Sequence, residues 1–589
     1  MHTLREVRIQ NYKSIIDLTL PLTNYTPLVG QNNAGKSNIL EAIKWFLQPS
    51  GLDIEAFNDP DEKIYVTGKI EGINEELFDE LKEKHQKQID KYIVDGEVTF
   101  RRIQLKPSGR KGDRKLEVRD PEKNEDDPEA FRDAPTGLPE ALDKLFPDCI
   151  FIEAMDDAPK DITKNQRSTT IGQLISSLSN SIEKNNKEIL EDSLGKLEEI
   201  FSAESENRAE QLNDFDEKAK EVIEDFFPGI QLKLHIPPPS IDDILKNGTV
   251  QVQEGEEELR DFESLGHGAQ RSIQMALIRL LREFKTEEDT GVRKFLLIEE
   301  PELYLHPSAI YNLRNALREL ASSKFQVLFA THSPIVISRD DISNTILIRK
   351  HSSKGTYKLG SMRELVDKEI TENDKQAEVL FNLTNSSKIL FSGTVLLMEG
   401  KAEKNIIPDV FEKVSGDLRK EKQIAFIPMN GGGGIPKAKK ILKAMDLKTL
   451  SLVDLDFCFR EAIKKGIIDE DDEDIAKCTE IIKELSEEKG IAIDSNGFPT
   501  KNDHFEASEA YVELAKEENL QLHLKKIQEK LAAQGYWMWR KGDIEETFGI
   551  ETKGHYQQLM KDLNKTDDWR SVLKEAEEIE DFVNWIIEY

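Results

Sequence analysis

Several stretches of the chain are apolar for four or five consecutive residues and then end in polar side chains. The clearest, Phe295 to Ile298, is followed directly by Glu299 and Glu300. Such a run is typical of a parallel strand that is covered on both faces, because the usual alternation disappears when neither face meets water. The same pattern predicts buried strands at 26–29, 326–330, 394–398, 424–428 and 450–453.

Helical patterns alternate with these strands, and a β-rich region precedes most of them. Residues 4–22 alternate in polarity and predict two strands joined by a turn at Asn11–Ser14. Residues 62–120 are also β-rich, with a charged helix expected near 74–91. Further helices are predicted at 38–47, 272–284, 307–322, 435–444, 469–490 and 508–534. The pattern as a whole predicts a two-part α/β protein.

Residues 163–227 are polar and favour helix, with apolar positions at helical spacing. These positions include Ile171, Leu174, Ile175, Leu178 and Ile182. We interpret the region as two or three helices inserted into the first part. A coiled-coil-like arm, a dimerisation element and an ordinary helical subdomain all fit this sequence.

Composition narrows the class of protein. The length of 589 residues is enough for two to four domains, and 38% of the residues are apolar and 33% charged. The net charge of −32 argues against a protein that coats nucleic acid through a broadly basic surface. Three scattered cysteines give neither a disulfide framework nor a zinc spacing, which fits a reducing cytosol. The N-terminal residues do not form a signal peptide, and no apolar run is long enough to cross a membrane. We expect a cytoplasmic protein without a membrane partner.

A phosphate-binding loop follows the first buried strand. Residues Gly30 to Ser37 read GQNNAGKS, the G-x-x-x-x-G-K-S pattern, and the predicted helix 38–47 comes next. Glycines let backbone N–H groups curl around phosphates, and the helix N-terminus adds favourable partial charge. Lys36 is expected to reach the β- and γ-phosphates and Ser37 a Mg²⁺ ion. The predicted nucleotide ligands here are Gly30, Asn32, Asn33, Gly35, Lys36 and Ser37.

The acids after Ile298 fit the same nucleotide. Ligands of open α/β sheets bind at the carboxyl ends of the strands, where Glu299 and Glu300 stand. One acid is expected to reach the metal ion or its water shell, and Glu300 to orient an attacking water as the ATPase base.

A second set of acids follows later strands. Glu399 ends the run 394–398 and Glu403 lies four residues on; on one helix such residues share a face. Asp454 and Asp456 follow the run 450–453, and alternate residues of an extended chain also share a face. We expect these four carboxylates to hold Mg²⁺ or Mn²⁺, and two such ions can promote phosphodiester cleavage. Glu399, Asp454 and Asp456 are thus also candidate catalytic residues.

The order of these motifs resembles the OLD (overcoming lysogenization defect) family. The phosphate-binding loop, SLGHGAQ at 264–270, IEEPELYLHP at 298–307 and ATHSP at 330–334 are similar to its ABC-type ATPase domain, which is related to SMC and RecF heads. The glutamate after 394–398, the glycines Gly431 to Gly434 and the D-x-D of 454–456 resemble its TOPRIM domain. The resemblance covers nearly the whole chain. Glu299 stands where such ATPases usually have Asp, and no Q-loop glutamine is assigned.

The resemblance implies an ABC ATPase head at 1–390, with a helical insertion at about 160–230, and a TOPRIM nuclease domain with a helical extension at 391–589. It implies that Ser264, Gly266 and Gly268 bind the γ-phosphate of a nucleotide held by another subunit, hence at least a dimer, and that His332 contacts a γ-phosphate. It further implies Glu545 as a metal ligand, with Asp543 weaker, and a catalytic lysine among Lys541, Lys553 and Lys574.

The function implied is a DNA endonuclease that uses ATP and Mg²⁺ or Mn²⁺ and serves in anti-phage defence. Relatives act alone or beside a co-encoded partner: a helicase in Gabija, or a reverse transcriptase with its RNA–DNA product in some retrons. One alternative is a repair or chromosome-maintenance ATPase whose TOPRIM domain only binds DNA. Another is an ATP-gated effector that cleaves RNA or degrades nucleotides.

One basic stretch stands out in this acidic chain. Residues 101–119 carry eight basic residues and two acidic ones. They fit contact with a DNA backbone, and they equally fit a solvated hairpin with a glycine-rich tip.

Overall fold

The structure is a computed structural model, and it describes most of the chain between His2 and Tyr589. The residues outside the description are 1, 74–85, 87–89, 125–126, 128, 136–137, 140–141, 143–148, 155–185, 225–226, 228, 231, 238–243, 245–249, 254, 256–257, 281–293, 324, 360–373, 381–382, 417–423, 551–555 and 567. Most of the helix expected at 74–91, the apolar positions named between 171 and 182, and Lys553 therefore lie outside the described residues.

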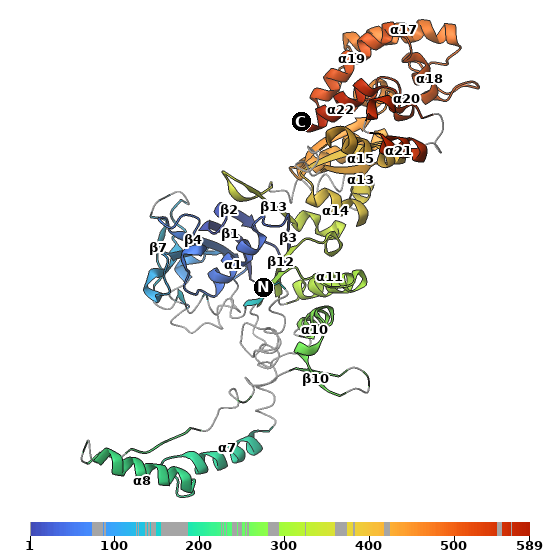
Figure 1. The fold of residues 1–589 in the computed structure, drawn as a ribbon. Helices are drawn as coiled ribbons and strands as arrows, with labels where there is room; N and C mark the ends of the chain where they lie inside the picture. Colours follow the sequence, from blue (N-terminus) through green and yellow to red (C-terminus); the bar gives the residue numbers. More distant parts are fainter. Residues whose placement is uncertain are drawn as a thin grey trace. The chain divides into compact units, whose positions relative to one another are not determined.

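The chain divides into two compact units. The first comprises residues 1–28, 33–331 and 350–357, and the second comprises 29–32, 332–349 and 358–589 (Figure 1). Each is described by itself below. The division expected at 390 and 391 stays a prediction.

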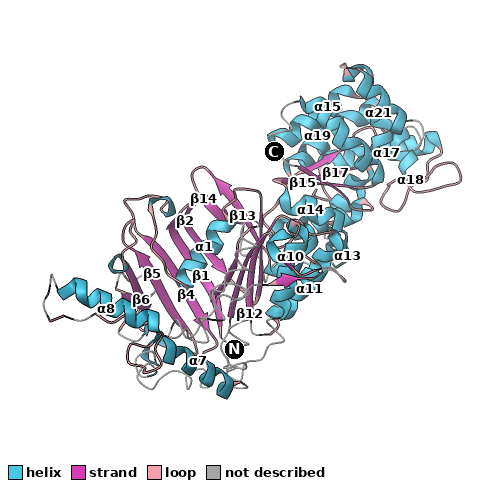
Figure 2. Cartoon of the chain, turned by 60° about the horizontal axis from the view of Figure 1, so that its bottom comes forward, coloured by secondary structure: helices cyan, strands magenta, loops and turns pink. Residues whose placement is uncertain are grey.

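Twelve described strands form one large sheet, in the order β7-β6-β5-β4-β1-β2-β14-β13-β3-β12-β11-β8 (Figure 2). From β7 to β2 the pairing is antiparallel, whereas β11 pairs in parallel with β12 and β8. The strands are β1 (Thr3–Tyr12), β2 (Ile15–Pro21), β3 (Tyr25–Gly30), β4 (Ile64–Glu71), β5 (Val98–Gln104), β6 (Arg114–Arg119), β7 (Phe131–Asp133), β8 (Cys149–Ile152), β11 (Lys294–Glu299), β12 (Phe325–Thr331), β13 (Ile346–His351) and β14 (Gly355–Lys358).

The strands that precede the candidate nucleotide residues are buried throughout. Every residue of β3 and of β12 is buried, and so are Phe295 to Ile298 of β11. The one strongly polar side chain in β12, Gln326, bonds to the N-terminal strand: its Oε1 accepts from Leu4 N at 3.0 Å and its Nε2 donates to Leu4 O at 2.8 Å. A residue 322 positions later thus fixes the start of the chain.

Helices of the first unit include α1 (Lys36–Leu47), α7 (Lys187–Phe201), α8 (Glu210–Glu224), α10 (His267–Leu280) and α11 (Pro307–Ala321), with a short ribbon of β9 (Gln251–Val252) and β10 (Arg260–Asp261). α10 begins five residues before the predicted start, because the N–H groups of Ala269 and Gln270 already bond to the Gly266 carbonyl. α11 begins where predicted, with Pro307 at its first position and His306 as its cap.

The second unit is built on a four-stranded parallel sheet, in the order β16-β15-β17-β18. The strands are β15 (Thr394–Met398), β16 (Ile424–Pro428), β17 (Lys448–Val453) and β18 (Tyr536–Met538). The helices are α13 (Asp374–Leu380), α14 (Leu383–Phe391), α15 (Lys401–Ser415), α16 (Ile435–Ala444), α17 (Glu473–Lys489), α18 (Ala507–Leu514), α19 (Glu518–Ala533), α20 (Ile544–Phe548), α21 (Tyr556–Lys565) and α22 (Ala576–Glu588). The predicted strand 424–428 and helix 435–444 have the same bounds in the structure.

Both faces of this sheet are covered, which explains the continuous apolar runs. Successive side chains of β15 alternate between two cores: Val395 and Leu397 pack with α16, α17 and α19, whereas Leu396 and Met398 pack with α15 and α22. All four side chains are fully buried. Among the described residues, no helix combines the length and apolar character needed to cross a membrane.

Candidate nucleotide and metal sites

The phosphate-binding loop connects β3 to α1, and side chains from elsewhere in the first unit hold it. Gly35 has a φ of 99°, and a Cβ there would collide with the hydroxyls of Thr356 and Ser14. Thr356 Oγ1 donates to the Ala34 carbonyl at 3.0 Å, and Ser14 Oγ lies 2.7 Å from Thr356 Oγ1. Only glycine therefore fits the turn that brings Lys36 and Ser37 to the start of α1. Nothing in the sequence around Ser14 or Thr356 indicates that these residues hold the phosphate-binding loop.

Glu299 and Ser37 meet at the end of β11. The Ser37 hydroxyl bonds to the Glu299 carboxylate, which also accepts from Ala154 N at 3.4 Å. Burial raises the pKa of Glu299 above its ordinary value despite these bonds. A hydroxyl and a carboxylate beside the phosphate-binding loop form a donor set that suits Mg²⁺.

Glu300 is held in an unusual backbone conformation. Its φ is 42°, in the left-handed region that residues other than glycine rarely adopt. Its N–H donates to the Ala330 carbonyl at 2.8 Å, and its own carbonyl accepts from Arg271 at 2.9 Å. Strained residues of this kind cluster at functional sites, which fits the expected role of an ATPase base.

Arg271 is a residue that the sequence reasoning missed. Its side chain is fully buried; it donates to the carbonyl of Glu299 at 2.8 Å and to the Gln274 side chain at 2.8 Å. It thus fixes the turn that carries both glutamates from α10, some thirty residues earlier in the chain. Its place directly after the SLGHGAQ motif was the available signal.

The signature-like residues lie at the start of α10. Ser264 and Gly266 are exposed, and Gly268 is inside the first turn of the helix, not before it as predicted. Ser264 Oγ donates to the Asp261 carbonyl at 2.7 Å. His332 follows β12, and its ring lies 6.4 Å from that of Phe391 in the second unit. The nucleotide roles of these four residues stay predictions.

In the second unit, Glu399 lies against the glycine run. Its carboxylate accepts from Asp454 N at 3.2 Å and from the Gly432 backbone. A Cβ at Gly432 would lie 2.9 Å from Glu399 Cδ and closer still to Oε1. Gly432 is therefore needed for close approach to a carboxylate. Burial and then Asp456 raise the pKa of Glu399 to about 7.

Four of the predicted acids gather at the carboxyl edge of β15 and β17. Burial raises the pKa of Asp454 well above its ordinary value, with further contributions from Glu399 and Glu403. Burial also raises the pKa values of Glu403 and Asp456. Buried carboxylates that raise one another's pKa values can all be ionised together only with positive charge nearby; otherwise they retain protons.

Two geometric arguments used to group these acids were wrong, although the grouping itself is observed. Glu399 precedes α15, whose N-cap is Gly400, so it does not share a helix face with Glu403. Glu403 bonds back to Gly400 N at 3.0 Å. Asp456 is already helical, and the segment 454–456 is not extended, because a turn at residue 455 starts a helix. The strand ends, through their tertiary arrangement, bring the acids together.

The segment after β18 adds further carboxylates. Asp543 caps α20 by accepting from Glu546 N at 2.8 Å, and burial raises its pKa. Both Asp543 and Glu545 interact electrostatically with Glu403. Glu545 accepts a 2.6 Å hydrogen bond from the hydroxyl of Tyr556, a contact the sequence did not suggest.

The choice of catalytic lysine among Lys541, Lys553 and Lys574 stays a prediction with three alternatives. Lys541 lies 3.9 Å from Glu575, and Lys574 forms an ion pair with Glu546.

The acids fit a divalent cation by charge and by donor type. Asp454 Oδ1 is buried and accepts no hydrogen bond within the described part of the chain. Elsewhere in the cluster backbone amides hold the acids. As the side chains stand, no three His, Cys, Asp or Glu residues in the described part of the chain are placed to hold one metal ion together. A hard cation that takes oxygen ligands would satisfy the unpartnered oxygen and offset the repulsion.

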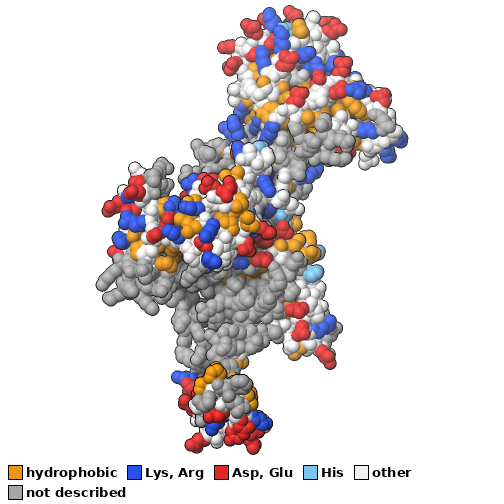
Figure 3. Space-filling model, turned by 60° about the vertical axis from the view of Figure 1, so that its left-hand side comes forward, with side chains coloured by type: hydrophobic (Ala, Val, Ile, Leu, Met, Phe, Trp, Pro, Cys, Tyr) orange, Lys and Arg blue, Asp and Glu red, His pale blue; other side chains and the backbone are white. Residues whose placement is uncertain are grey.

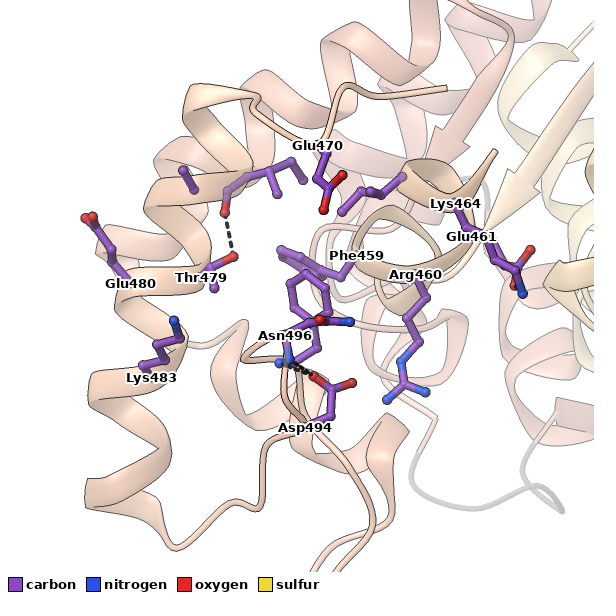
Figure 4. A pocket seen from close by; sticks show the side chains of 14 residues that line it. Phe459, Arg460, Glu461, Lys464, Glu470, Thr479, Glu480, Lys483, Asp494 and Asn496 are labelled. Carbon is purple, nitrogen blue, oxygen red and sulfur yellow. Dashed lines mark hydrogen bonds and ion pairs between the residues drawn. The ribbon is translucent and has the colours of Figure 1, made fainter. Parts of the chain in front are cut away.

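A hollow of about 990 Å³ lies beside the residues that follow Asp456 (Figure 4). One wall is the π-helical turn Cys458–Ala462, and Arg460 from this turn donates to the Pro499 carbonyl at 2.6 Å. Arg460 also lowers the pKa of Asp456, opposing the larger effect of burial. The hollow carries acids and bases in similar number, including Lys464, Glu480 and Lys483, and so favours no ligand charge.

The basic stretch 101–119 forms the hairpin of β5 and β6. Several of its arginines bond within the protein: Arg101 to Glu117, Arg102 to the Phe46 carbonyl and Arg114 to the Pro49 carbonyl at 2.7 Å. Acidic and basic side chains are interspersed on the surface seen in Figure 3. A role of this hairpin in DNA contact stays a prediction.

The two candidate sites lie in segments that match two known protein families. Residues 3–337 match the family model of an AAA ATPase domain, and residues 390–456 match that of an overcoming lysogenization defect protein-like TOPRIM domain. The chain is 34% identical to the Old nuclease of Escherichia phage P2, over 99% of both chains. It is 23% identical to the OLD nuclease of Thermus scotoductus, over 77% of this chain and 82% of that one. It is 25% identical to the endonuclease GajA of Bacillus cereus, over 72% and 69% respectively.

Proposed function

Given that the chain belongs to the OLD nuclease family, as an endonuclease with an ABC-type ATPase domain and a TOPRIM domain, we propose that it is an ATP-regulated, divalent-metal-dependent DNA endonuclease. ATP and Mg²⁺ or Mn²⁺ are the proposed cofactors and DNA the proposed substrate. The observation that carries the proposal is the cluster of buried acids at the carboxyl edge of β15 and β17, with Asp454 Oδ1 unpartnered among the described residues.

We assign the metal to Glu399, Glu403, Asp454, Asp456 and Glu545. When bound, hard divalent ions supply Lewis-acid stabilisation of the attacking and leaving oxygens of a phosphodiester. The chain's own part is to hold the carboxylates: Gly432 and Asp454 N fix Glu399, Gly400 N fixes Glu403, and Tyr556 fixes Glu545. A buried, preorganised donor set keeps its geometry through the reaction.

ATP is proposed to bind the loop at Gly30 to Ser37, with Lys36 on its phosphates and Glu299 and Ser37 at its metal. Glu300, held rigidly by Arg271 and Ala330, is proposed to orient the attacking water. The exposed start of α10 supports a second nucleotide contact made from another copy of the chain, hence an oligomer.

The test is cleavage of supercoiled plasmid by the full chain with Mg²⁺ or Mn²⁺, with and without ATP. Asp454→Asn keeps the shape of the side chain and is expected to abolish nicking and linearisation. Asp471→Asn, at an exposed acid of the same unit, is the matched control. Lys36→Ala shows whether nucleotide activates or restrains cleavage. Cleavage by Asp454→Asn at the wild-type rate would place the site elsewhere.

We further propose a cytoplasmic role in anti-phage defence, alone or with a co-encoded helicase or a retron reverse transcriptase and its RNA–DNA. Family membership supports this role, and the three buried cysteines, none of which forms a disulfide, suit a reducing compartment. Phage plating on cells that carry the gene with its neighbours tests it, because Asp454→Asn should restore plaques. Protection that survives this substitution would refute a nuclease-based defence.

A further inference from the structure

The helix that follows the glycine run carries only positive charge. α16 contains Lys437, Lys439, Lys440 and Lys443, and no acidic residue occurs from Ile424 to Met445. The chain has 113 acidic residues among 589. At that frequency a stretch of this length would hold about four acids. The separation of charge is therefore a property of this segment and not of the protein.

Three of these lysines point away from the protein. The other side of α16 packs on the sheet through Ile435, Ala438, Ile441 and Leu442, among others, whereas Lys437, Lys440 and Lys443 are exposed. None of the three has an ion-pair partner within the described part of the chain.

The fourth lysine of α16 has a structural role. Lys439 Nζ donates to the Gly535 carbonyl at 2.8 Å and lies 3.7 Å from the ring centre of Tyr536. Burial and then Lys443 lower its pKa to about 7. It is therefore not available to a partner, and the exposed set is limited to three lysines.

An all-lysine face is unfavourable for the helix itself. Like charges three or four residues apart repel, and α16 has such pairs at 437/440, 440/443 and 439/443. Other helices of the unit alternate charge: in α17, Lys477 pairs with Glu480 at 2.9 Å. Alternating charges of this kind are sufficient to keep a helix soluble. An anionic partner that binds the lysine face would offset the repulsion between its lysines.

The position of the face identifies the partner. α16 starts at Ile435, directly after the glycine run, in which the Gly432 backbone bonds to Glu399. Lys437 is therefore in the first helical turn after the segment that contacts the metal-binding acids. Lys437 and Lys443 are about 9 Å apart along the helix, similar to two or three nucleotide steps of one DNA strand. One acid, Glu461, approaches the start of the helix near Gly433, and Lys464 lies 3.7 Å from it.

We propose that Lys437, Lys440 and Lys443 form the surface on which the phosphate backbone of the DNA substrate docks beside the metal-binding acids. The inference rests on the proposed function and adds where the substrate lies. The contacts are independent of sequence, because lysine on phosphate positions a duplex without reading bases.

The test compares two triple variants of the full chain. Lys437→Gln/Lys440→Gln/Lys443→Gln removes the face, and glutamine keeps a similar helix propensity. Lys501→Gln/Lys516→Gln/Lys525→Gln, at exposed lysines of the same unit, changes the net charge equally. Binding of a short fluorescein-labelled duplex is followed by anisotropy in Ca²⁺ over a range of salt concentrations. Thermal melting checks that each variant is folded.

Loss of three phosphate contacts should lower the slope of log K against log salt by about 2.7 and weaken binding at least tenfold, while the control keeps both. An unchanged slope, or an equal loss in the control, overturns the proposal; the first result would leave an acidic protein segment as the occupant of the face. A wild type that neither binds nor cleaves DNA overturns the proposed function as well. A wild type that cleaves while the α16 variant binds normally overturns the lysine face alone.

Discussion

Gly432→Ala tests whether the glycine at this position is required to admit the Glu399 carboxylate. The backbone at Gly432 is outside the left-handed region, so alanine is tolerated by the chain conformation itself. Its Cβ would nevertheless stand 2.9 Å from Glu399 Cδ and 3.1 Å from Oε2, where ordinary contacts begin near 3.4 Å. Oε1 would be nearer still, so the carboxylate must retreat by about 1 Å, which exceeds the displacement of about 0.5 Å that a preorganised site tolerates.

The expected result is a loss of cleavage without a loss of fold. The obstacle is the end of a flexible side chain, so the melting temperature should change little. Displacement of a catalytic group by this amount should lower the cleavage rate roughly 10- to 100-fold. ATP hydrolysis, which depends on the other unit, should stay at the wild-type rate. Plasmid cleavage and phosphate release measured on the same preparation separate the two activities.

The neighbouring glycine is the matched control. A Cβ at Gly433 would meet only Glu461, at 3.9 Å, which is ordinary contact. Gly433→Ala should cleave like the wild type. If Gly432→Ala cleaves normally, or if both variants fail equally, then close approach to Glu399 is not the reason for the glycine.

Three further outcomes follow from partly buried side-chain hydrogen bonds. Arg271→Met removes hydrogen bonds to two carbonyls and should destabilise the first unit by about 3 kcal/mol in denaturant unfolding; a change below 1 kcal/mol would contradict its supporting role. Lys530 lowers the pKa of Asp474 to about 2, below the ordinary value near 4, so this carboxylate contributes stability above about pH 4 that is lost as pH falls toward 2. Asp474→Asn should therefore be less stable than the wild type at pH 7 and equal to it near pH 2, whereas a constant difference would exclude this linkage. Tyr556→Phe frees Glu545 and should raise the Mn²⁺ concentration needed for half-maximal cleavage 10- to 100-fold; an unchanged requirement would argue against Glu545 as a ligand.

The sequence predicted where the strands and helices lie better than how the side chains at their ends meet. Continuous apolar runs located β11, β12 and β15 because burial on both faces leaves a strong local signal. The grouping of Glu399 with Glu403 was reached through a shared helix face that does not exist, since Glu399 precedes the cap of α15. Local spacing cannot show this, because the chain is still extended at Gly400 and the helix begins only at Lys401.

Other parts of the sites had no local signal at all. Thr356, from a hairpin more than 300 residues after the phosphate-binding loop, shapes Gly35 through tertiary contact alone. Tyr556, at the start of α21, bonds to Glu545 in α20, and one tyrosine among eleven carries no pattern. The acids proposed to bind metal could be located because they follow predicted strand ends. The residues that fix them could not, because their partners are distant in sequence.

The order of strands in the large sheet has a consequence for synthesis on the ribosome. The strand that carries the phosphate-binding loop, β3, lies between β13 and β12, which are both synthesised some 300 residues later. The hydrogen-bond partner of Leu4, Gln326, is likewise synthesised 322 residues after it. At about 5–20 residues per second, the N-terminal strands remain without these neighbours for on the order of 15–60 s. Chaperones therefore have a long interval in which to bind them. The first TOPRIM strand, β15, is made only after every described strand of that sheet, so a nascent chain completes this sheet before it possesses any of the acids proposed to cleave DNA.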